Sequence, residues 1–129
     1  MTRQTKSMST PLARARGLGS AKSGLHHWWH QRVSAVAMVV LVSWMVVLLF
    51  SLVEADYQTA MNILAHPVNA TVVVLFVAVG LWHASLGIQV VLEDYVANEG
   101  ARLIAILAVK MTASVTAILA ILSVLKVAL

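Results

Sequence analysis

The most informative side chain in this sequence is His83, about two-thirds of the way along an apolar run from Val68 to Leu92. A run of this length can cross a bilayer, so the imidazole is an ionisable group held in hydrocarbon. Such groups are costly inside a membrane and mark ligands, proton relays or cofactor sites. A neutral imidazole is also an axial ligand for haem iron. The chain contains no cysteine, which excludes iron–sulfur clusters, thiolate-ligated haem and disulfide bonds.

Two glycines flank this histidine on the same helical face. Gly80 lies three residues before His83, and Gly87 lies four residues after it. The missing side chains would leave a flat gap beside the imidazole, which the edge of a porphyrin could fill. The simpler interpretation is that Gly80, Ala84 and Gly87 only allow helices to pack closely, and both can hold, because a haem between helices also needs close approach. For His83 itself, the alternative to iron ligation is a hydrogen bond to a neighbouring helix, and its depth and neighbours favour ligation.

Two polar residues at the end of the same run could handle protons or a carbonyl group. Asp94 is eleven residues after His83, on nearly the same helical face and about 16 Å further along. A phenol at Tyr95 can donate a hydrogen bond to a carbonyl oxygen, and the adjacent carboxylate can orient it or relay protons. The alternatives are an aromatic interfacial anchor for Tyr95 and a solvated helix end for Asp94, and the residues alone do not decide.

A cationic cluster precedes the first apolar run, in the segment L-H-H-W-W-H-Q-R. It holds His26, His27, His30 and Arg32. His26 and His30 have a spacing that permits metal binding on a helix, but neither carboxylate nor cysteine is nearby. A cluster that receives lipid phosphates or haem propionates is the better interpretation. For His27 and His30, simple contact with lipid headgroups is an equal alternative.

A second axial ligand could come from this chain or from another. His30 is about 15 Å shallower than His83, and His66 lies at the opposite membrane face, so neither reaches the same iron. Met111 lies nine residues into the third apolar run, which keeps a His/Met pair open. A histidine from another polypeptide is favoured. Lys110 lies at similar depth and is expected to snorkel toward the cytoplasmic side.

Three apolar runs must position these groups. The chain is 60% hydrophobic and only 11% charged, which excludes a soluble domain. Each run is long enough to cross a hydrocarbon core of about 30 Å as a helix, whereas a single-chain barrel needs at least about eight strands. The sequence predicts an all-α integral membrane protein. Residues 1–24 would form a basic flexible tail, and residues 25–129 a membrane anchor domain. The three transmembrane helices of this domain are expected at about residues 30–53, 67–94 and 101–127.

The distribution of charge predicts the orientation. The segment before the first helix is basic and lacks acidic residues, whereas the loop after it holds Glu54 and Asp56 and no basic residue. The positive-inside rule places the N-terminus in the cytoplasm and the C-terminus, with Lys126, outside. A bacterial inner membrane is the expected location. The mitochondrial inner membrane is the alternative, because the tail resembles an organellar transit peptide.

Two segments resemble a known family. H-A-S-L-G-I-Q-V-V-L-E-D-Y-V, from His83 to Val96, resembles the signature of the hydrophobic membrane anchor subunit of succinate dehydrogenase (complex II, succinate:quinone oxidoreductase). S-G-L-H-H-W-W-H-Q-R-V-S-A-V, which includes Arg32, is similar to the entry of that family's first helix, especially in α-proteobacteria. The resemblance covers nearly the whole chain. The first of these two motifs is fairly specific, and the second is looser.

The resemblance implies a role for each matching residue. His83 would ligate haem b, with the opposite histidine supplied by the cytochrome b subunit. Tyr95 would hydrogen-bond ubiquinone with Asp94 beside it. Arg32 and His26 would approach the haem propionates. The family pattern assigns no role to three further residues, Lys110, His27 and His30.

The implied protein is a non-catalytic anchor within an enzyme complex, forming a haem-binding helical bundle with a partner subunit. A flavoprotein subunit would oxidise succinate, and an iron–sulfur subunit would pass the electrons to ubiquinone. Membrane lipid is the other partner, and no nucleic acid is expected. One alternative is the anchor of a quinol:fumarate reductase. Another is a non-redox scaffold or proton-path component that uses His83 and Lys110.

Overall fold

The described part of the chain forms three long helices and two short ones. The structure is a computed structural model that describes residues 10–15 and 24–129, and this described part contains no strand. Most of the tail predicted for residues 1–24 lies outside it. The all-α prediction with three transmembrane helices is confirmed, because three of the helices are long and apolar enough to cross a membrane. The elements are α1 (Pro11–Ala15), α2 (Gly24–Leu52), α3 (Tyr57–Ala65), α4 (Pro67–Tyr95) and α5 (Glu99–Ala128).

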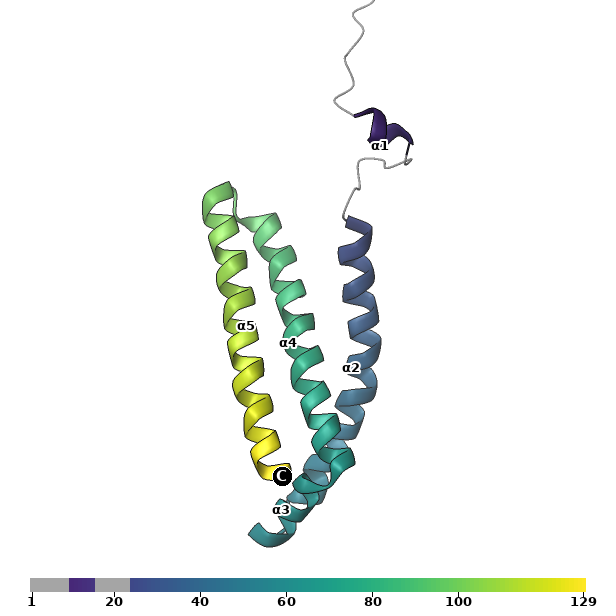
Figure 1. Cartoon of the computed structure of the whole chain (residues 1–129), viewed down its shortest axis with the longest axis vertical. Coiled ribbons are helices and arrows are strands. Elements are labelled where there is room, and N and C mark those ends of the chain that lie inside the picture. Colours follow the sequence, from purple (N-terminus) through teal and green to yellow (C-terminus); the bar gives the residue numbers. More distant parts are fainter. Residues whose placement is uncertain (1–9, 16–23) are drawn as a thin grey trace, which may run out of the picture.

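Helix α4 is the centre of the arrangement. It packs against α2 on one side and α5 on the other, as Figure 1 shows. Short α3 lies at the end where α2 finishes, and it contacts both α4 and α5. The opposite end, where residues 96–98 join α4 to α5, is called here the α4–α5 end. Groups on α4 can therefore meet groups on α2 from one face and groups on α5 from another.

Helix α2 starts earlier than the sequence predicted. Its first residue is Gly24, whereas the apolar pattern placed the start near residue 30. The intervening residues include two tryptophans and three histidines but no proline, so nothing interrupts the backbone hydrogen bonds between residue 24 and the apolar run. The histidine cluster therefore lies on the helix and not before it, which gives its members a fixed helical spacing.

The segment between the first two spans is mostly helical, which the sequence analysis did not predict. Asp56 caps α3, and its Oδ1 accepts a hydrogen bond from the backbone N–H of Thr59 at 2.8 Å. Hydrogen bonds from Thr59 lower the pKa of the Asp56 carboxyl, with the larger effect from the Thr59 side chain and the smaller from its backbone N–H. Helix α3 ends at Ala65, and Pro67 occupies the first turn of α4, where its missing N–H costs nothing.

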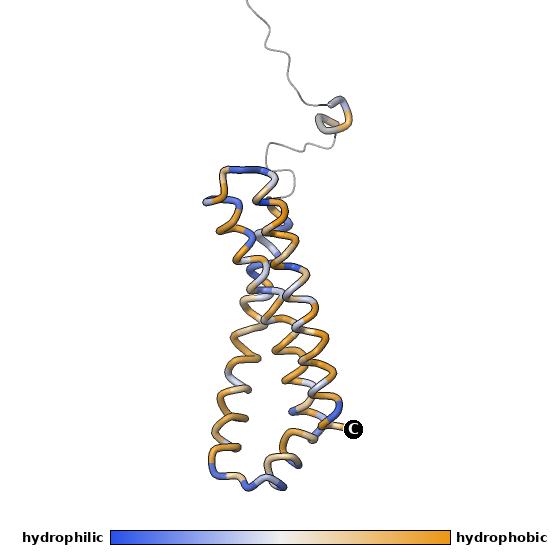
Figure 2. The backbone as a smooth tube through the Cα atoms, turned by 90° about the vertical axis from the view of Figure 1, so that its left-hand side faces the viewer, coloured by the Kyte–Doolittle hydropathy of each residue, from blue (hydrophilic) through white to orange (hydrophobic). Residues whose placement is uncertain are grey.

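The long helices bury little of their apolar surface against one another. None of the residues in the most apolar window of α5 is buried within the chain. Figure 2 shows hydrophobic residues along most of the bundle and hydrophilic ones mainly near its two ends. Helices that are apolar on nearly all sides need lipid or protein around them. The chain is a multi-pass membrane protein.

A chain of hydrogen bonds joins three helices near the α3 end. Trp44 Nε1 donates to Asn69 Oδ1 at 3.2 Å, and Asn69 Nδ2 donates to the carbonyl of Ile63 at 2.8 Å. These bonds connect α2, α4 and α3. Hydrogen bonds between polar side chains stabilise helix packing inside a membrane, so this contact helps to set the position of α2 along α4.

Candidate functional site

His83 faces α2. Its Nδ1 lies 2.8 Å from the hydroxyl oxygen of Ser34, and its Nε2 lies 3.4 Å from the side-chain nitrogen of Gln31. Ser34 is buried, with 7% of its surface exposed, and its hydroxyl also lies 3.1 Å from the carbonyl oxygen of Gln31. The predicted alternative for His83, a hydrogen bond to a neighbouring helix, is therefore present at one ring nitrogen. The contact at the other nitrogen is long for a hydrogen bond and correspondingly weak.

A cavity of about 620 Å³ lies beside this imidazole, between α2 and α4. The Arg32 guanidinium carbon lies 5.6 Å from the centre of the Trp28 ring, within the range of a cation–π contact. The walls combine two imidazoles, a guanidinium, a carboxylate, amides and apolar surface. The lining residues are His27, Trp28, Gln31, Arg32 and Ala35 from α2, and His83, Gln89, Val90 and Glu93 from α4.

Three buried polar atoms on the cavity walls have no hydrogen-bond partner in the described structure. They are His27 Nε2, Gln31 Oε1 and Gln89 Oε1. The amide nitrogen of Gln89, by contrast, donates to Glu93 Oε1 at 2.7 Å. Buried polar groups in folded proteins are nearly always paired, so unpaired ones indicate that water or a ligand belongs beside them. The cavity is therefore suited to a polar or partly polar occupant.

The glycines beside His83 do not leave the flat gap that the sequence predicted. A Cβ atom at Gly80 would lie 3.6 Å from the terminal methyl carbon of Met38, and one at Gly87 would lie 3.6 Å from the Gln31 side-chain nitrogen. Side chains of α2 therefore occupy the space above both positions. The close-packing interpretation holds for these glycines, and neither of them is among the residues that line the cavity.

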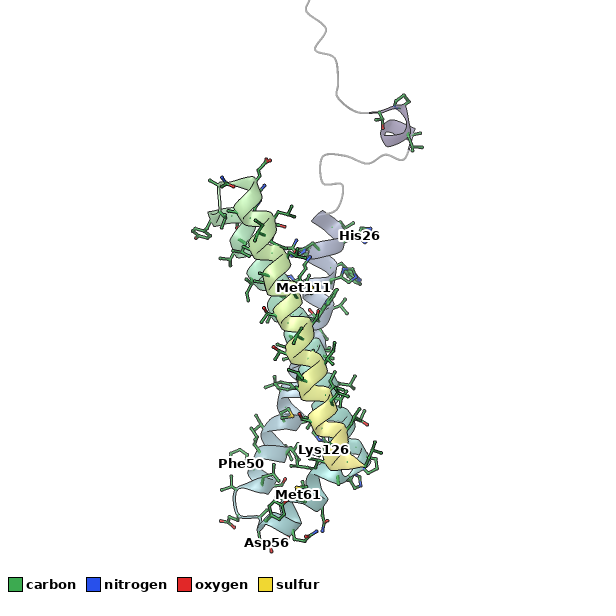
Figure 3. All side chains as sticks on the ribbon, turned by 60° about the vertical axis from the view of Figure 1, so that its left-hand side comes forward. His26, Phe50, Asp56, Met61, Met111 and Lys126 are labelled. Carbon is green, nitrogen blue, oxygen red and sulfur yellow. The ribbon has the colours of Figure 1, made fainter. Side chains whose placement is uncertain are left out.

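The structure brings only part of the predicted propionate-binding cluster to the cavity. Arg32 lines it, whereas His26 is exposed and lies on the outer side of α2 in Figure 3. His27 takes the cavity position. The sequence contained a signal for this, because His27, Gln31 and Ser34 are spaced four and then three residues apart and share one helical face. His30 is not among the cavity residues, and its ring is edge-on to the Trp82 ring, with 6.4 Å between the ring centres.

Asp94 and Tyr95 lie at the last turn of α4 and do not line the cavity. Both are exposed, Tyr95 with 84% of its surface, and the Tyr95 hydroxyl has no hydrogen-bond partner within the described residues. Met111, labelled on α5 in Figure 3, is 59% exposed and is not among the cavity residues. The structure thus gives no support to an iron site built from His83 and Met111.

Two further alternatives from the sequence also lack support. Among the described residues, no group of three or more histidine, aspartate or glutamate side chains is arranged to hold a metal ion, so neither His26 nor His30 belongs to a group of that size. Lys110 lines a separate hollow of about 360 Å³ between α4 and α5, together with Trp82. His83 and Lys110 therefore do not share a cavity, which argues against a proton path that uses both.

The amino-acid sequence of this chain is similar to those of several known proteins. Residues 6–117 match the family model described as succinate dehydrogenase/fumarate reductase transmembrane subunit. A succinate dehydrogenase hydrophobic membrane anchor subunit from Rickettsia bellii is 35% identical over 81% of this chain and 84% of its own length. The protein of the same name from Paracoccus denitrificans is 34% identical over 67% of each chain. A succinate dehydrogenase membrane anchor subunit from Reclinomonas americana is 29% identical over 71% of this chain and 79% of its own. No solved structure matches the chain.

Proposed function

Since this chain belongs to the succinate dehydrogenase/fumarate reductase transmembrane subunit family, we propose that it anchors a succinate dehydrogenase in the membrane, supplies one axial ligand to haem b and forms part of a ubiquinone-reducing site. The observation that carries the proposal is His83, which lines a cavity between two membrane-spanning helices and makes only a long contact at Nε2. An imidazole in that position is available as a ligand.

The residues around the cavity fit a haem group. An imidazole nitrogen is needed for the iron, cations for the propionates and apolar surface for the porphyrin. His83, Arg32 and the Trp28 ring meet these needs, and His27 Nε2 is a buried atom without a partner. Glu93 on the opposite wall would repel carboxylates, so Arg32 and His27 are the residues that would hold the propionates. Bound haem supplies a one-electron carrier.

His26 stays a candidate for the propionates, as the family resemblance implied, although His27 and not His26 lines the cavity. Because His26 is exposed on α2, it could reach a propionate only at the rim of the site. Contact with lipid phosphates is the competing role for this side chain.

Tyr95 and Asp94 are the proposed contribution to the ubiquinone site. Their exposure at the end of α4 supports this role, because the unpaired phenol is free to donate a hydrogen bond to a quinone carbonyl. Asp94 would orient the phenol or relay protons to the reduced quinone. Two exposed residues cannot enclose a ring, so the proposal requires walls from the cytochrome b and iron–sulfur subunits. A flavoprotein subunit would oxidise succinate.

The proposed location is a bacterial inner membrane, with the N-terminus in the cytoplasm. The basic segment before α2 and the acidic pair, Glu54 and Asp56, after it support this orientation. The α4–α5 end, with Asp94 and Tyr95, would then face the cytoplasm, where the soluble subunits would dock. In a mitochondrion the same end would face the matrix.

The direct test is the optical spectrum of the purified complex carrying His83→Ala. We expect the low-spin bis-histidine signal in the reduced-minus-oxidised spectrum to be altered or lost, because the proposed iron ligand is gone. His66→Ala is the control, since His66 is exposed near the α3 end of the bundle. An unchanged spectrum with His83→Ala would show that His83 does not ligate haem. Comparing succinate oxidation with fumarate reduction in the same complex would distinguish the two enzymes that the family description covers.

A further inference from the structure

One tautomer of His83 accounts for all the contacts around its ring together. The side-chain nitrogen of Gln31, 3.4 Å from His83 Nε2, can only donate. With this amide orientation, Nε2 makes the contact only as an acceptor, and the ring proton of the neutral imidazole is then on Nδ1; in the other tautomer, Ser34 would donate to Nδ1 and the Gln31 contact would be lost. The Nδ1–H then donates to the Ser34 hydroxyl oxygen at 2.8 Å, and the Ser34 hydroxyl proton donates to the Gln31 carbonyl at 3.1 Å. All three contacts are satisfied with one donor for each acceptor.

Ser34 differs from the other hydroxyl groups of the membrane spans. Ser43, Thr71 and Ser114 each donate to a carbonyl in their own helix. Ser85 makes a closer comparison, because it is buried to the same extent as Ser34, at 7% exposure, and donates to the carbonyl of Trp82 at 2.8 Å. Among the described residues, only Ser34 combines such a backbone bond with a contact to a histidine ring.

We propose that Ser34 is a positioning residue that holds His83 as its Nδ1–H tautomer and directs the Nε2 lone pair toward the cavity. A ring nitrogen binds a metal through its lone pair, and the hydrogen bond at the other nitrogen sets both the tautomer and the ring orientation. Ser34 is buried between the helices, with 7% of its surface exposed, so little room is left beside Nδ1 for a competing acceptor. The proposal deepens the haem role proposed above and depends on it only for the identity of the metal.

The Gln31 side chain lies next to His83 Nε2, where a bound metal would be. Its amide occupies the Nε2 side of His83 through the long 3.4 Å contact, and its own Oε1 has no partner. The side chain lines the cavity and can turn into it, which would release Nε2 without moving either helix. Bound iron would compete with the Gln31 amide for the Nε2 lone pair, whereas Ser34 contacts the opposite ring nitrogen and could keep that contact.

The first test measures the tautomer without haem. The full-length chain, labelled with ¹⁵N-histidine and reconstituted in lipid bilayers, is studied by ¹⁵N NMR, with His83→Gln to assign the signal. We expect His83 to be protonated at Nδ1. Ser34→Thr keeps the hydroxyl and should preserve this state. Ser34→Val introduces a side chain with the shape of threonine but without the hydroxyl, so it should shift His83 toward protonation at Nε2. A ring protonated at Nε2 in the unmodified chain, or identical spectra for Ser34→Thr and Ser34→Val, would overturn the proposal.

The second test uses the assembled complex and the affinity for haem b. Loss of a hydrogen bond to a metal-ligating histidine typically weakens metal binding about 10–100-fold. In a haem-release assay, the Ser34→Val complex should therefore lose haem correspondingly more readily than the Ser34→Thr complex. Ser85→Ala is the matched control and should retain haem normally. Equal retention by Ser34→Val and Ser34→Thr would contradict the positioning role. If His83 proves not to ligate haem, the NMR result still decides whether Ser34 sets its tautomer.

Discussion

Replacing Tyr95 by phenylalanine separates a quinone contact from a structural role with little ambiguity. Tyr95 is the last residue of α4, 84% of its surface is exposed, and its hydroxyl has no partner among the described residues. Removing the hydroxyl therefore breaks no hydrogen bond within the described chain, and phenylalanine keeps the aromatic ring. Assembly of the complex and its haem content should stay normal. Any functional change must come from a group outside these residues.

The size of the expected effect follows from the single bond that is lost. A neutral hydrogen bond contributes about 0.5–1.5 kcal/mol, and about 1.4 kcal/mol corresponds to a factor of ten. Tyr95→Phe should therefore lower the efficiency of ubiquinone reduction by roughly twofold to twelvefold if the phenol only binds the carbonyl. A larger loss, concentrated in kcat, would show that the phenol also takes part in proton delivery.

The assay is succinate-dependent reduction of a short-chain ubiquinone, with kcat and KM measured separately. An artificial acceptor that takes electrons before the quinone site should be reduced at the normal rate. The chain has its own matched control in Tyr57, which is 78% exposed and begins α3 at the other end of the bundle, so Tyr57→Phe should leave both parameters unchanged. If Tyr95→Phe behaves like Tyr57→Phe, Tyr95 is only an interfacial anchor and the assignment of the quinone site is wrong.

Three further predictions follow from the charge distribution and the cavity. Reporter domains fused after Asp56 and after Leu129 should both report the outer side of the membrane, and a cytoplasmic signal from either would contradict the proposed orientation. Arg32→Gln should weaken haem retention more than His26→Gln, because only Arg32 lines the cavity; the reverse order in a haem-release assay would refute this. Met111→Leu should leave the reduced-minus-oxidised spectrum unchanged, and a spectrum altered by this change alone would restore the His/Met alternative.

The sequence predicted the long helices because their signal is local. Three apolar runs of membrane-spanning length admit few other structures, and the spans observed at Leu25–Leu52, Pro67–Tyr95 and Glu99–Ala128 contain the predicted runs almost completely. The short helix Tyr57–Ala65 was missed because its nine residues are too few to cross a membrane and Gln58, Thr59 and Asn62 interrupt its apolar positions. Its start was nonetheless encoded, since Asp56 lies where a helix cap is expected.

The site was predicted less completely because it depends on how two helices face each other. His83 was identified by its cost in hydrocarbon, a property of one residue on one helix. Ser34 and Gln31 were not, because their importance comes from the rotation of α2 against α4. Helices that are apolar on nearly all sides carry little periodic signal to set that rotation. A predicted helix that began at Gly24 would have placed His27, Gln31 and Ser34 on one face and so identified them together.

The unpaired atoms around the cavity also bear on which face of the bundle the proposed partner subunit would cover. His27 Nε2, Gln31 Oε1 and Gln89 Oε1 would each cost about 1–3 kcal/mol if they stayed unpaired in a dry environment. Lipid tails cannot pair them, whereas haem, water held by a partner, or the partner's own polar groups can. The outer surface of α5 carries large exposed aliphatic residues, Leu107, Ile118 and Leu122 among them, which hydrocarbon solvates without penalty. The proposed anchor therefore has two unlike surfaces: an α2–α4 face that lipid alone cannot satisfy, and an α5 face that lipid can.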